Sequence, residues 1–331
     1  MKKTLLKTFY NLGAFAPFHW TTRDKVLILT YHRFSPEAHP SKISAEEFAA
    51  HLEYLKKHNH ILSLSETAER LTNGASLPRG ATVITIDDGY ADAYEIAFPI
   101  LKRYEMPATL YAVTDFLDGK CWLWTDLMRY VLTETKSENL NVEFENCGKI
   151  ETKLTDERQR LEIAGRVNAR LKKLQNERKD ARINEIAASL EVEIPALPSD
   201  NFAPVTLEQA REMDANNLSV ESHTVTHPIL TNINQAQLDF ELQISKKRLE
   251  TILDREVENF CYPNGSFNAQ VQKSVENAGY KCAVTTAYGF NEKQANQFTL
   301  NRIDAQPAIE NFVQSVSGFE AVKQRLQNVR N

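Results

Sequence analysis

The sequence predicts an α/β fold: a distorted, incomplete (β/α)7 TIM-like barrel with an inserted helical segment. Short β-branched runs recur along the 331 residues, and their continuous apolar character is typical of parallel strands buried on both faces. A helical pattern follows each run, and this alternation occurs seven times. Such alternation favours a parallel α/β barrel, and the sequence contains no glycine-rich phosphate fingerprint that would indicate a Rossmann fold.

The expected strands are the seven β-branched runs, which lie at residues 26–32, 82–88, 108–113, 218–224, 259–264, 280–286 and 299–305. Helical periodicity is clearest between them, at residues 45–58, 94–104, 237–253 and 269–279. The last of these helices ends on Gly279, a residue type that commonly follows a helix because it tolerates the left-handed conformation. The next expected strand begins directly afterwards, as a β/α repeat requires.

Residues 134–199 interrupt this rhythm, because they are helical in pattern, highly charged and poor in β-branched residues. We expect one or two helices here, inserted between the third and fourth strands. Pro195, Pro198 and Pro204 mark the return to the barrel. The expected organisation has four parts: an N-terminal amphipathic segment at 1–25, a barrel split over 26–133 and 200–310, the helical insertion at 134–199, and a C-terminal helix at 311–331.

The composition favours a soluble globular protein. Apolar residues make up 42% of the chain and charged residues 25%, which is enough for a large core. The net charge of −5 argues against a nucleic-acid-binding protein, whose binding surface would be basic. No apolar run approaches the length of a membrane-spanning helix. The cysteines form no C-x-x-C pair, so we expect reduced thiols in a cytosolic protein: Cys121, Cys147, Cys261 and Cys282.

The first twenty residues combine a basic start with apolar residues at helical spacing. Lys7, Thr8 and Asn11 interrupt the apolar run, so the segment differs from a cleavable secretory signal. Two alternatives remain open: residues 1–20 contact an anionic membrane surface as an amphipathic helix, or this helix packs on the protein's own barrel. We expect a cytoplasmic protein, and the first alternative places it peripherally at the inner face of the membrane.

Polar residues follow four of the expected strands, at the end where barrel enzymes place their functional groups. Asp87 and Asp88 follow the second strand, and because neighbouring side chains on a strand diverge, one carboxylate can bind a metal while the other accepts a proton. His223 and His227 follow the fourth strand, four residues apart. Together with Asp88 they form a three-ligand set for a divalent cation. The alternatives are a helix-capping aspartate and incidental surface histidines.

Three short motifs carry a resemblance to a known family. T-I-D-D-G, S-H-T-V-T-H and Y-P-N-G occur in this order at the expected strand ends. Their combination resembles the polysaccharide deacetylase family, the NodB-homology domain of carbohydrate esterases, over residues 26–133 and 200–305. The opening Y-H-R-F is similar to a subgroup found in exopolysaccharide biosynthesis. The resemblance implies a distorted, incomplete (β/α) barrel, in agreement with the strand pattern.

The resemblance also implies a role for individual residues. Asp87 would be the general base, and Asp88, His223 and His227 would bind a divalent metal ion, usually zinc in relatives. The backbone N–H of Asn264 would stabilise the oxyanion. The implied reaction is hydrolysis of an N-acetyl group on an amino sugar, with release of acetate.

The sequence departs from the family pattern at two places. Many relatives carry an arginine just before the proline of the Y-P-N-G segment, where it orients the base; here the segment 260–262 is Phe-Cys-Tyr. Many carry a late histidine as general acid, whereas this chain has none after His227. His32 is the candidate acid, with a positioning role or an unrelated role as alternatives. Arg302 and Asp304 are candidates to orient the base in place of the missing arginine.

The expected substrate is an N-acetylated saccharide: a polysaccharide, an oligosaccharide or a lipid-linked glycan precursor. Four aromatic residues near the motifs are candidates for stacking on sugar rings, with ordinary packing as the alternative: Tyr90, Trp122, Trp124 and Tyr262. Two other functions remain open on the sequence alone. One is another metallohydrolase acting on an ester or a non-peptide C–N bond, and the other is a non-catalytic carbohydrate-binding protein.

Overall fold

The computed structural model describes residues 2–144, 148–198 and 200–328. Within these residues, seven parallel strands form a closed barrel: β1 (Leu27–Tyr31), β5 (Ala81–Ile86), β6 (Ala108–Ala112), β9 (Leu218–Ser222), β10 (Asn259–Cys261), β11 (Cys282–Tyr288) and β12 (Leu300–Asp304). The ring closes because β1 pairs with β12 on one side and with β5 on the other. All seven predicted strands and the (β/α)7 barrel class are thereby confirmed.

The barrel is regular on one side and distorted on the other. β1 and β5 pair over five residues, from Leu27 with Thr82 to Tyr31 with Ile86, and both strands are buried along their whole length. β9 and β10 share only the pair Ser222 and Phe260, and the register between β11 and β12 shifts. The catalytic motifs predicted after β9 and β10 therefore follow the loosely paired part of the ring.

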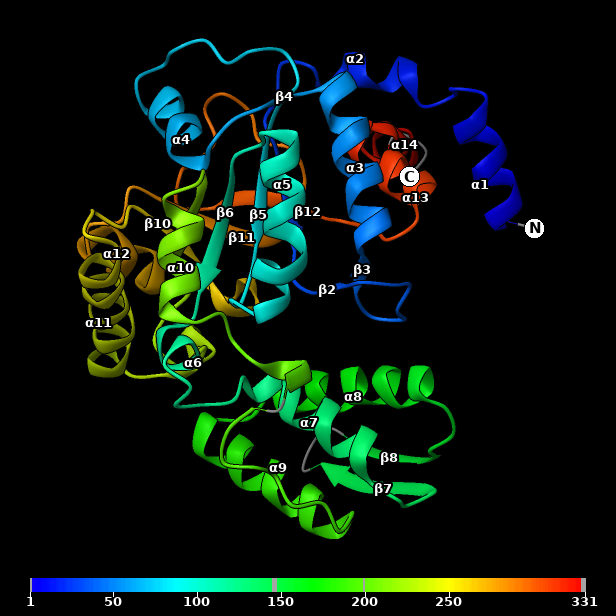
Figure 1. Cartoon of the computed structure of the whole chain (residues 1–331), viewed down its shortest axis with the longest axis vertical. Coiled ribbons are helices and arrows are strands. Elements are labelled where there is room, and N and C mark those ends of the chain that lie inside the picture. The colour runs from blue at the N-terminus through cyan, green and yellow to red at the C-terminus, as the bar shows by residue number, and fades with distance from the viewer. Residues whose placement is uncertain (1, 145–147, 199, 329–331) are drawn as a thin grey trace.

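Helices surround the barrel, as Figure 1 shows. They are α3 (Ala45–His58), α4 (Leu64–Thr72), α5 (Phe98–Tyr104), α10 (Leu207–Asp214), α11 (Gln235–Leu253), α12 (Ala269–Asn277) and α13 (Ile309–Val316). The start of α3 illustrates how the sequence sets these boundaries. The Ser44 side chain accepts a hydrogen bond from the Glu47 N–H, while the Glu47 side chain accepts one from the Ser44 N–H. Short elements β2 (Phe34–Ser35), β3 (Ile43–Ser44) and β4 (His60–Ile61) complete this part of the chain.

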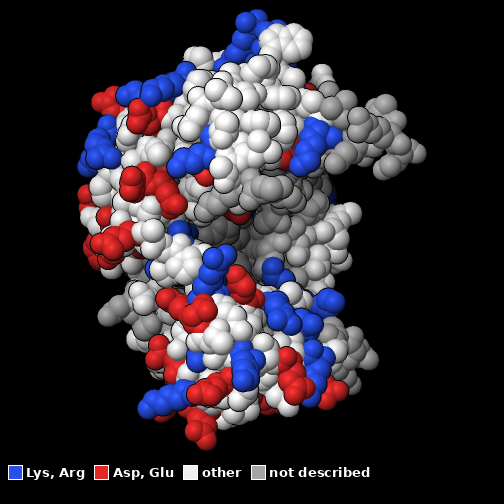
Figure 2. All heavy atoms as spheres, turned by 90° about the vertical axis from the view of Figure 1, so that its right-hand side faces the viewer, with Lys and Arg blue, Asp and Glu red and all other residues white. Residues whose placement is uncertain are grey.

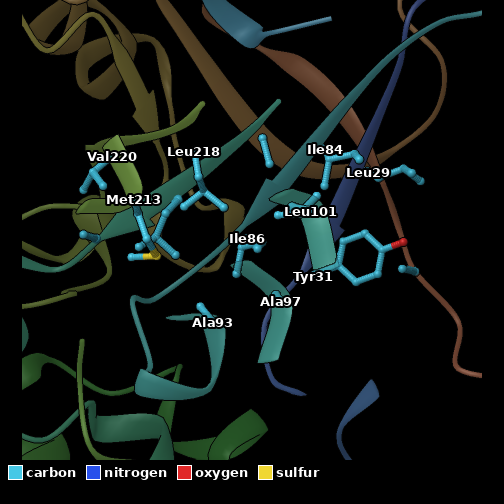
Figure 3. Packing of buried hydrophobic residues seen from close by; sticks show 14 of the residues in the cluster. Leu29, Tyr31, Ile84, Ile86, Ala93, Ala97, Leu101, Met213, Leu218 and Val220 are labelled. Carbon is cyan, nitrogen blue, oxygen red and sulfur yellow. The ribbon is translucent and has the colours of Figure 1, made fainter. Parts of the chain in front are cut away.

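The main core lies between the strands and these helices. Figure 3 shows Ile84 and Ile86 of β5 close to Ala97 and Leu101 of the neighbouring helical segment. Leu218 of β9 belongs to the same buried cluster. Interlocking of this kind makes the strands a rigid support for the loops at their carboxyl ends.

The insertion forms a second layer with its own core. It begins before the expected residue 134, because α7 (Trp124–Glu134) packs in the same core. The other elements are a hairpin of β7 (Asn139–Phe144) and β8 (Gly148–Lys153), α8 (Glu157–Leu171) and α9 (Asn176–Ser189). A separate hydrophobic cluster joins these elements, with Met128, Ile150, Val167 and Ile183 fully or almost fully buried. In Figure 1 the insertion lies below the barrel, beyond the carboxyl ends of the strands.

The hairpin corrects the prediction of a wholly helical insertion. Buried and exposed residues alternate along β7, so this is a half-buried strand despite its polar composition. The expected C-terminal helix is also two helices, α13 and α14 (Phe319–Asn328). They separate at Gly318, where φ is 91° and an added Cβ would collide with Thr22.

The N-terminal segment begins with α1 (Lys2–Asn11) and continues through α2 (His19–Thr22). Phe15 is buried against Phe319, with ring centroids 5.5 Å apart, so this part of the segment packs on the protein itself. Leu5, Phe9 and Leu12 remain exposed. Among the described residues, the helices are each too short or too polar to cross a lipid bilayer.

Candidate active site

A cleft of about 510 Å³ lies between the carboxyl ends of the barrel strands and the insertion. Its lining combines strand-end residues such as Asp87 and His223 with Thr125 of α7 and Asn168 of α8. Figure 2 shows a hollow between the upper and lower parts of the molecule on the face where this cleft opens. The insertion therefore forms the second wall of the site.

The D-D-G turn places two carboxylates side by side at the end of β5. The Asp87 N–H donates to the carbonyl of Tyr31 at 2.8 Å, which continues the pairing of β1 with β5 by one residue. The backbone then turns sharply, with φ of 78° at Asp88 and 89° at Gly89. Positive φ at an aspartate is strained, and strain of this kind is characteristic of functional sites. The two carboxylates consequently point to different partners, as the strand pattern predicted.

The loop after β9 carries both histidines and is hydrogen-bonded to a residue of α11. Thr224 and His227 have φ of 75° and 59°, and the His227 N–H donates to the Thr224 hydroxyl at 3.0 Å. The buried carboxylate of Glu241 accepts hydrogen bonds from the backbone N–H groups of Val225 and Thr226, and from the Thr226 hydroxyl. Glu241 thus fixes the loop in its strained conformation.

Asp88, His223 and His227 form a compact set of potential metal ligands. Their nearest ligand atoms lie within 4.8 Å of one another, and Asp88 Oδ1 is 3.5 Å from His223 Nε2 and 3.6 Å from His227 Nε2. His223 Nδ1 donates to the carbonyl of Cys261 at 2.7 Å, which directs Nε2 to the other two ligands. Two imidazole nitrogens and one carboxylate oxygen are a donor set that suits zinc.

In the absence of a metal ion, the electrostatics favour the ligand forms of Asp88 and His227 but not that of His223. Burial lowers the pKa of His223, but the neighbouring Cys261 and the hydrogen bond with Asp88 outweigh this effect and raise it well above its usual value, so metal binding would displace a proton from His223. Burial alone would raise the pKa of Asp88, but the hydrogen bond from His223 and the charge of His227 hold it well below its usual range. Burial, together with neighbouring His223, lowers the pKa of His227 to about 3. An ionised carboxylate and a neutral imidazole are the protonation states that bind a cation.

Asp87 stays outside the ligand set of Asp88, His223 and His227 and is bound by Arg302. Arg302 Nη1 donates to Oδ1 and Nη2 to Oδ2, each at 2.7 Å, in a bidentate pair that is almost completely buried. The Arg302 Nε donates to the carbonyl of Thr285, which fixes the guanidinium. Burial raises the pKa of Asp87, and the charge and hydrogen bonds of Arg302 outweigh this effect and lower it. Asp87 is therefore an oriented, ionised carboxylate.

Cys261 occupies the space beside this pair. Its Sγ accepts a hydrogen bond from Arg302 at 3.2 Å and lies 3.6 Å from Asp87 Oδ2. Burial raises the pKa of the Cys261 thiol, so it stays protonated and can donate to the carboxylate. The thiols of Cys121, Cys261 and Cys282 are free, and Cys147 lies outside the described residues.

His32 and Asn264 lie on the cleft near these groups. His32 Nε2 is 3.8 Å from Asp87 Oδ2, and the His32 side chain is 44% exposed, so it faces both the base and the cleft. Asn264 has φ of 55° in the turn Pro263–Gly265, and its side-chain Nδ2 is buried without an acceptor. Asp304 also lines the cleft. The structure thus brings all the polar residues predicted for the site to one place.

The predicted aromatic residues are placed differently, and three of them are corrected here. Tyr262 lines the cleft, although its hydroxyl donates to the carbonyl of Phe298. Tyr90 is buried and donates to Asp126, and Trp124 is buried in the core of the insertion. Trp122 packs on Tyr130 and Phe202 and donates to the Pro195 carbonyl. Tyr90, Trp122 and Trp124 do not line the cleft, because packing and hydrogen bonds already occupy them.

Sequence reasoning missed Glu241 and Cys261. Glu241 had a detectable signal, since it shares a helix face with the buried residues Leu238, Leu242 and Ser245, where an unpaired glutamate would be unfavourable. Cys261 carries no comparable signal, because a cysteine in an apolar strand is ordinary core.

A closed (β/α)7 barrel with histidines and aspartates gathered at its carboxyl end is an architecture of barrel hydrolases. The chain belongs to the polysaccharide deacetylase family: the family pattern described as "Polysaccharide deacetylase" matches residues 74–185 and 194–283, more than half of the sequence. Enzymes of this family remove N-acetyl groups with the help of a metal ion. The family, the fold class and the reaction class predicted from the sequence are therefore confirmed.

Individual proteins are similar to this chain in sequence or in fold. YxkH of Bacillus subtilis (strain 168) is 23% identical over 286 residues, which cover 86% of this chain and 73% of YxkH. The poly-beta-1,6-N-acetyl-D-glucosamine N-deacetylase of Staphylococcus epidermidis is 28% identical over 111 residues, which cover 29% of this chain and 38% of that protein. Among solved structures, the Streptococcus pyogenes deacetylase PplD in complex with acetate matches with a TM-score of 0.60, at 20% identity over 88% of this chain and 98% of PplD.

Proposed function

We propose that this protein hydrolyses the N-acetyl group of an amino sugar, in a polysaccharide, an oligosaccharide or a lipid-linked glycan precursor. Zn²⁺ is the proposed metal, held by Asp88, His223 and His227. One observation carries the proposal above all: Asp87, a buried ionised carboxylate, adjoins the ligand set and is oriented by Arg302 without joining it. A second carboxylate of this kind is what a hydrolase needs as a general base.

The proposed roles follow from these positions. A divalent ion supplies Lewis acidity toward the acetamide carbonyl and lowers the pKa of water beside it. Asp87 accepts the proton of the attacking water, because Arg302 keeps this carboxylate ionised and fixed. The backbone N–H of Asn264 donates to the developing oxyanion, a contribution of roughly 3–4 kcal/mol in comparable sites. Support for this role is that Asn264 lines the cleft in a turn with positive φ.

His32 is the proposed general acid. It lies 3.8 Å from Asp87 and is exposed to the cleft, so an imidazolium there can protonate the leaving amine. The chain therefore takes its acid from the end of β1, in place of the late histidine of many relatives. C–N cleavage then releases acetate and the free amino sugar.

The metal content of the purified protein tests the site without knowledge of the sugar. We expect about one divalent ion per chain in the wild type by elemental mass spectrometry, and its loss in His223→Ala. His51→Gln serves as the control, since His51 is buried elsewhere in the fold and should leave the metal content unchanged. Absence of metal from the wild type after reconstitution with Zn²⁺ would contradict the proposal.

We further propose a cytoplasmic location with peripheral contact at the inner face of the membrane. Support comes from the N-terminal segment, where Leu5, Phe9, Leu12 and Trp20 are exposed by 55%, 41%, 76% and 69%. Lysines at positions 2, 3 and 7 accompany them, and basic residues are attracted by the anionic lipids of that leaflet. Sedimentation with anionic vesicles should be lost in a Leu5→Ser, Phe9→Ser variant; equal sedimentation of variant and wild type would contradict the contact.

A further inference from the structure

Besides Arg302, four basic side chains surround the cleft, and they come from both of its walls. On the barrel side they follow β1 and precede β3, and on the insertion side they belong to α7 and the end of α8: Arg33, Lys42, Arg129 and Lys172. Figure 2 shows Lys and Arg side chains at the lower edge of the hollow. A basic cleft contrasts with the acidic net charge of the chain, −5.

The carboxylates close to these cations are too few to neutralise them. Asp92 is 2.7 Å from Arg33 and 3.6 Å from Lys42, so one carboxylate is shared by two cations. Asp126 accepts a hydrogen bond from Arg129 at 2.9 Å and is completely buried. Lys172 has no ion pair with any residue that the structure describes. Four cations thus face two carboxylates, both largely buried.

The remaining carboxylates of the cleft offset this surplus only as long as the proposed metal site holds no ion. Asp87 is neutralised by Arg302, and Asp88 belongs to the proposed metal site, where a divalent ion would add positive charge. Asp304 is the one further acidic residue that lines the cleft within the described residues. With the ion bound, the cleft therefore carries a net positive charge.

Each of the two lysines has an arginine as a like-charged neighbour, and Lys42 is also half-buried. Burial lowers the pKa of Lys42, and the nearby Arg33 lowers it further. Lys172 is exposed at the edge of the cleft, and the partial burial of its side chain together with the like charge of Arg129 lowers its pKa. An anion in the cleft would relieve the repulsion in both pairs. Arg33 and Arg129 are hydrogen-bonded to aspartates at 2.7 and 2.9 Å, whereas Lys42 is 3.6 Å from Asp92, so the two lysine ammonium groups are freer to turn toward the anion.

We propose that the cleft selects N-acetylated saccharides that carry an anionic substituent, a phosphate or a carboxylate, and that Lys42 and Lys172 bind this substituent. The inference rests on the proposed deacetylase function and specifies its substrate class. Neutral saccharides leave the surplus charge of both walls uncompensated, so they bind more weakly. The insertion thereby acts as a specificity element, because it supplies Lys172 and Arg129.

Binding to a zinc-loaded Asp87→Asn protein tests this class, since the saccharides then stay intact. The probes are chitotetraose as the neutral saccharide, N-acetylglucosamine 1-phosphate and UDP-N-acetylglucosamine for phosphate, and a hyaluronan tetrasaccharide for carboxylate. Calorimetry at low salt should give at least one anionic class about tenfold tighter binding than chitotetraose, an advantage that shrinks in 0.5 M NaCl. Comparing the phosphate and carboxylate arms identifies the substituent. Equal affinity for neutral and anionic probes would overturn the inference.

Substitution of the two lysines tests whether they cause the tighter binding of the anionic probes. Lys42→Gln and Lys172→Gln, each made in the Asp87→Asn protein, should weaken the anionic probe severalfold to tenfold and leave chitotetraose unchanged. Lys173→Gln is the matched control, because it removes the same charge from the next residue of the same helix end, outside the cleft lining. If Lys173→Gln weakens binding as much as Lys172→Gln, the anion is attracted by the overall positive electrostatic potential of this surface and not by a specific contact with Lys172. That result would contradict the proposed site.

Acetate release by the wild type distinguishes a failure of the proposed deacetylase function from a failure of the proposed substrate class. The proposed function fails if no probe yields acetate while anionic probes still bind to the Asp87→Asn protein. The substrate class fails if chitotetraose is deacetylated with a kcat/KM equal to that of the anionic probes. These outcomes differ, so each proposal can be contradicted on its own.

Discussion

The pairing of Asp87 with Arg302 is the residue-scale feature that distinguishes this site. Many relatives supply the orienting arginine from the segment before the Y-P-N-G proline, where this chain has Phe260, Cys261 and Tyr262. Here the arginine comes from β12, and its guanidinium contacts the sulfur of Cys261. The small cysteine leaves room for a guanidinium that arrives from a different strand. The same contact is thus achieved from another place in the sequence.

Arg302→Ala should cut turnover about a hundredfold or more, because Asp87 loses its fixed orientation. The pH profile gives the sharper test. Asp87 acts as a base only when ionised, so the rate falls as the pH drops through its pKa. Without Arg302 the burial of Asp87, which raises its pKa, is opposed only by the weaker effects of His32 and His223, so the acid limb of the profile must move to higher pH.

Arg302→Lys should recover part of the rate, since it keeps the charge and loses the bidentate geometry. Metal content should stay at the wild-type level in both variants, because Arg302 contacts no ligand. An Arg302→Ala protein with full metal content and an unshifted acid limb would contradict the orienting role.

The role assigned to His32 predicts a dependence on the leaving group. An amine must be protonated as it leaves, whereas a nitrophenolate leaves without a proton. His32→Ala should therefore lose deacetylation of N-acetyl sugars by about a hundredfold or more and retain cleavage of p-nitrophenyl acetate within a fewfold. Equal losses on both substrates would instead indicate that His32 positions Asp87, from which it is 3.8 Å away.

At the scale of elements, α11 controls the metal site through one residue. Glu241 binds the loop between the two histidines with three hydrogen bonds, and the loop contains positive φ at Thr224 and His227. Glu241→Gln removes charge and acceptors, so zinc affinity should fall about tenfold to a hundredfold. Competition with a chelator measures this affinity. Glu250→Gln is the control, because it makes the same change at a half-buried residue of the same helix whose partners are Lys246 and Val257 and not the histidine loop. An unchanged affinity in Glu241→Gln would contradict the supporting role.

The elements also show what the sequence could predict. The seven strands were predictable because each is a continuous apolar run, and burial on both faces produces that pattern. The β7–β8 hairpin was not, because its alternation is masked by polar residues within a charged, helix-rich segment. Local propensity gives way there to packing against the core of the insertion, where Ile150 is fully buried.

At the scale of the whole molecule, His51 joins α3 to the C-terminal part of the chain. Its Nδ1 accepts from the Tyr31 hydroxyl, its Nε2 donates to the Pro307 carbonyl, and its ring stacks on Phe312. Burial lowers the pKa of His51 to about 4, so the folded protein holds it neutral. Protonation favours the unfolded chain, and stability is therefore lost as the pH falls from about 6.5 toward 4.

Urea unfolding of the metal-free protein at pH 7.5 and pH 5.0 measures this loss. The wild type should lose about 2 kcal/mol more between these pH values than His51→Gln, which stays neutral at both. Metal-free samples keep the pH dependence of zinc binding out of the comparison. The same pH dependence in both proteins would contradict the coupling of His51 to folding.

The site as a whole was largely predictable, because barrel topology brings strand ends together whatever their separation in the sequence. This topology groups the four residues of the two aspartate and histidine motifs: Asp87, Asp88, His223 and His227. Arg302 and His32 became candidates because the chain lacks the family's usual orienting arginine and its late histidine. The aromatic residues could not be placed. Whether Tyr90 or Trp124 faces a cleft depends on the packing of the insertion, which the strand pattern does not determine.

The central claim is that Asp87 is a base distinct from the metal ligands, and a single comparison tests it most directly. Wild type and Asp87→Asn are loaded with Zn²⁺, and metal content and acetate release from N-acetylated saccharides are measured on the same samples. We predict about one zinc ion per chain in both proteins and acetate release by the wild type alone. Turnover by Asp87→Asn at the wild-type rate, or loss of its metal, would contradict the account.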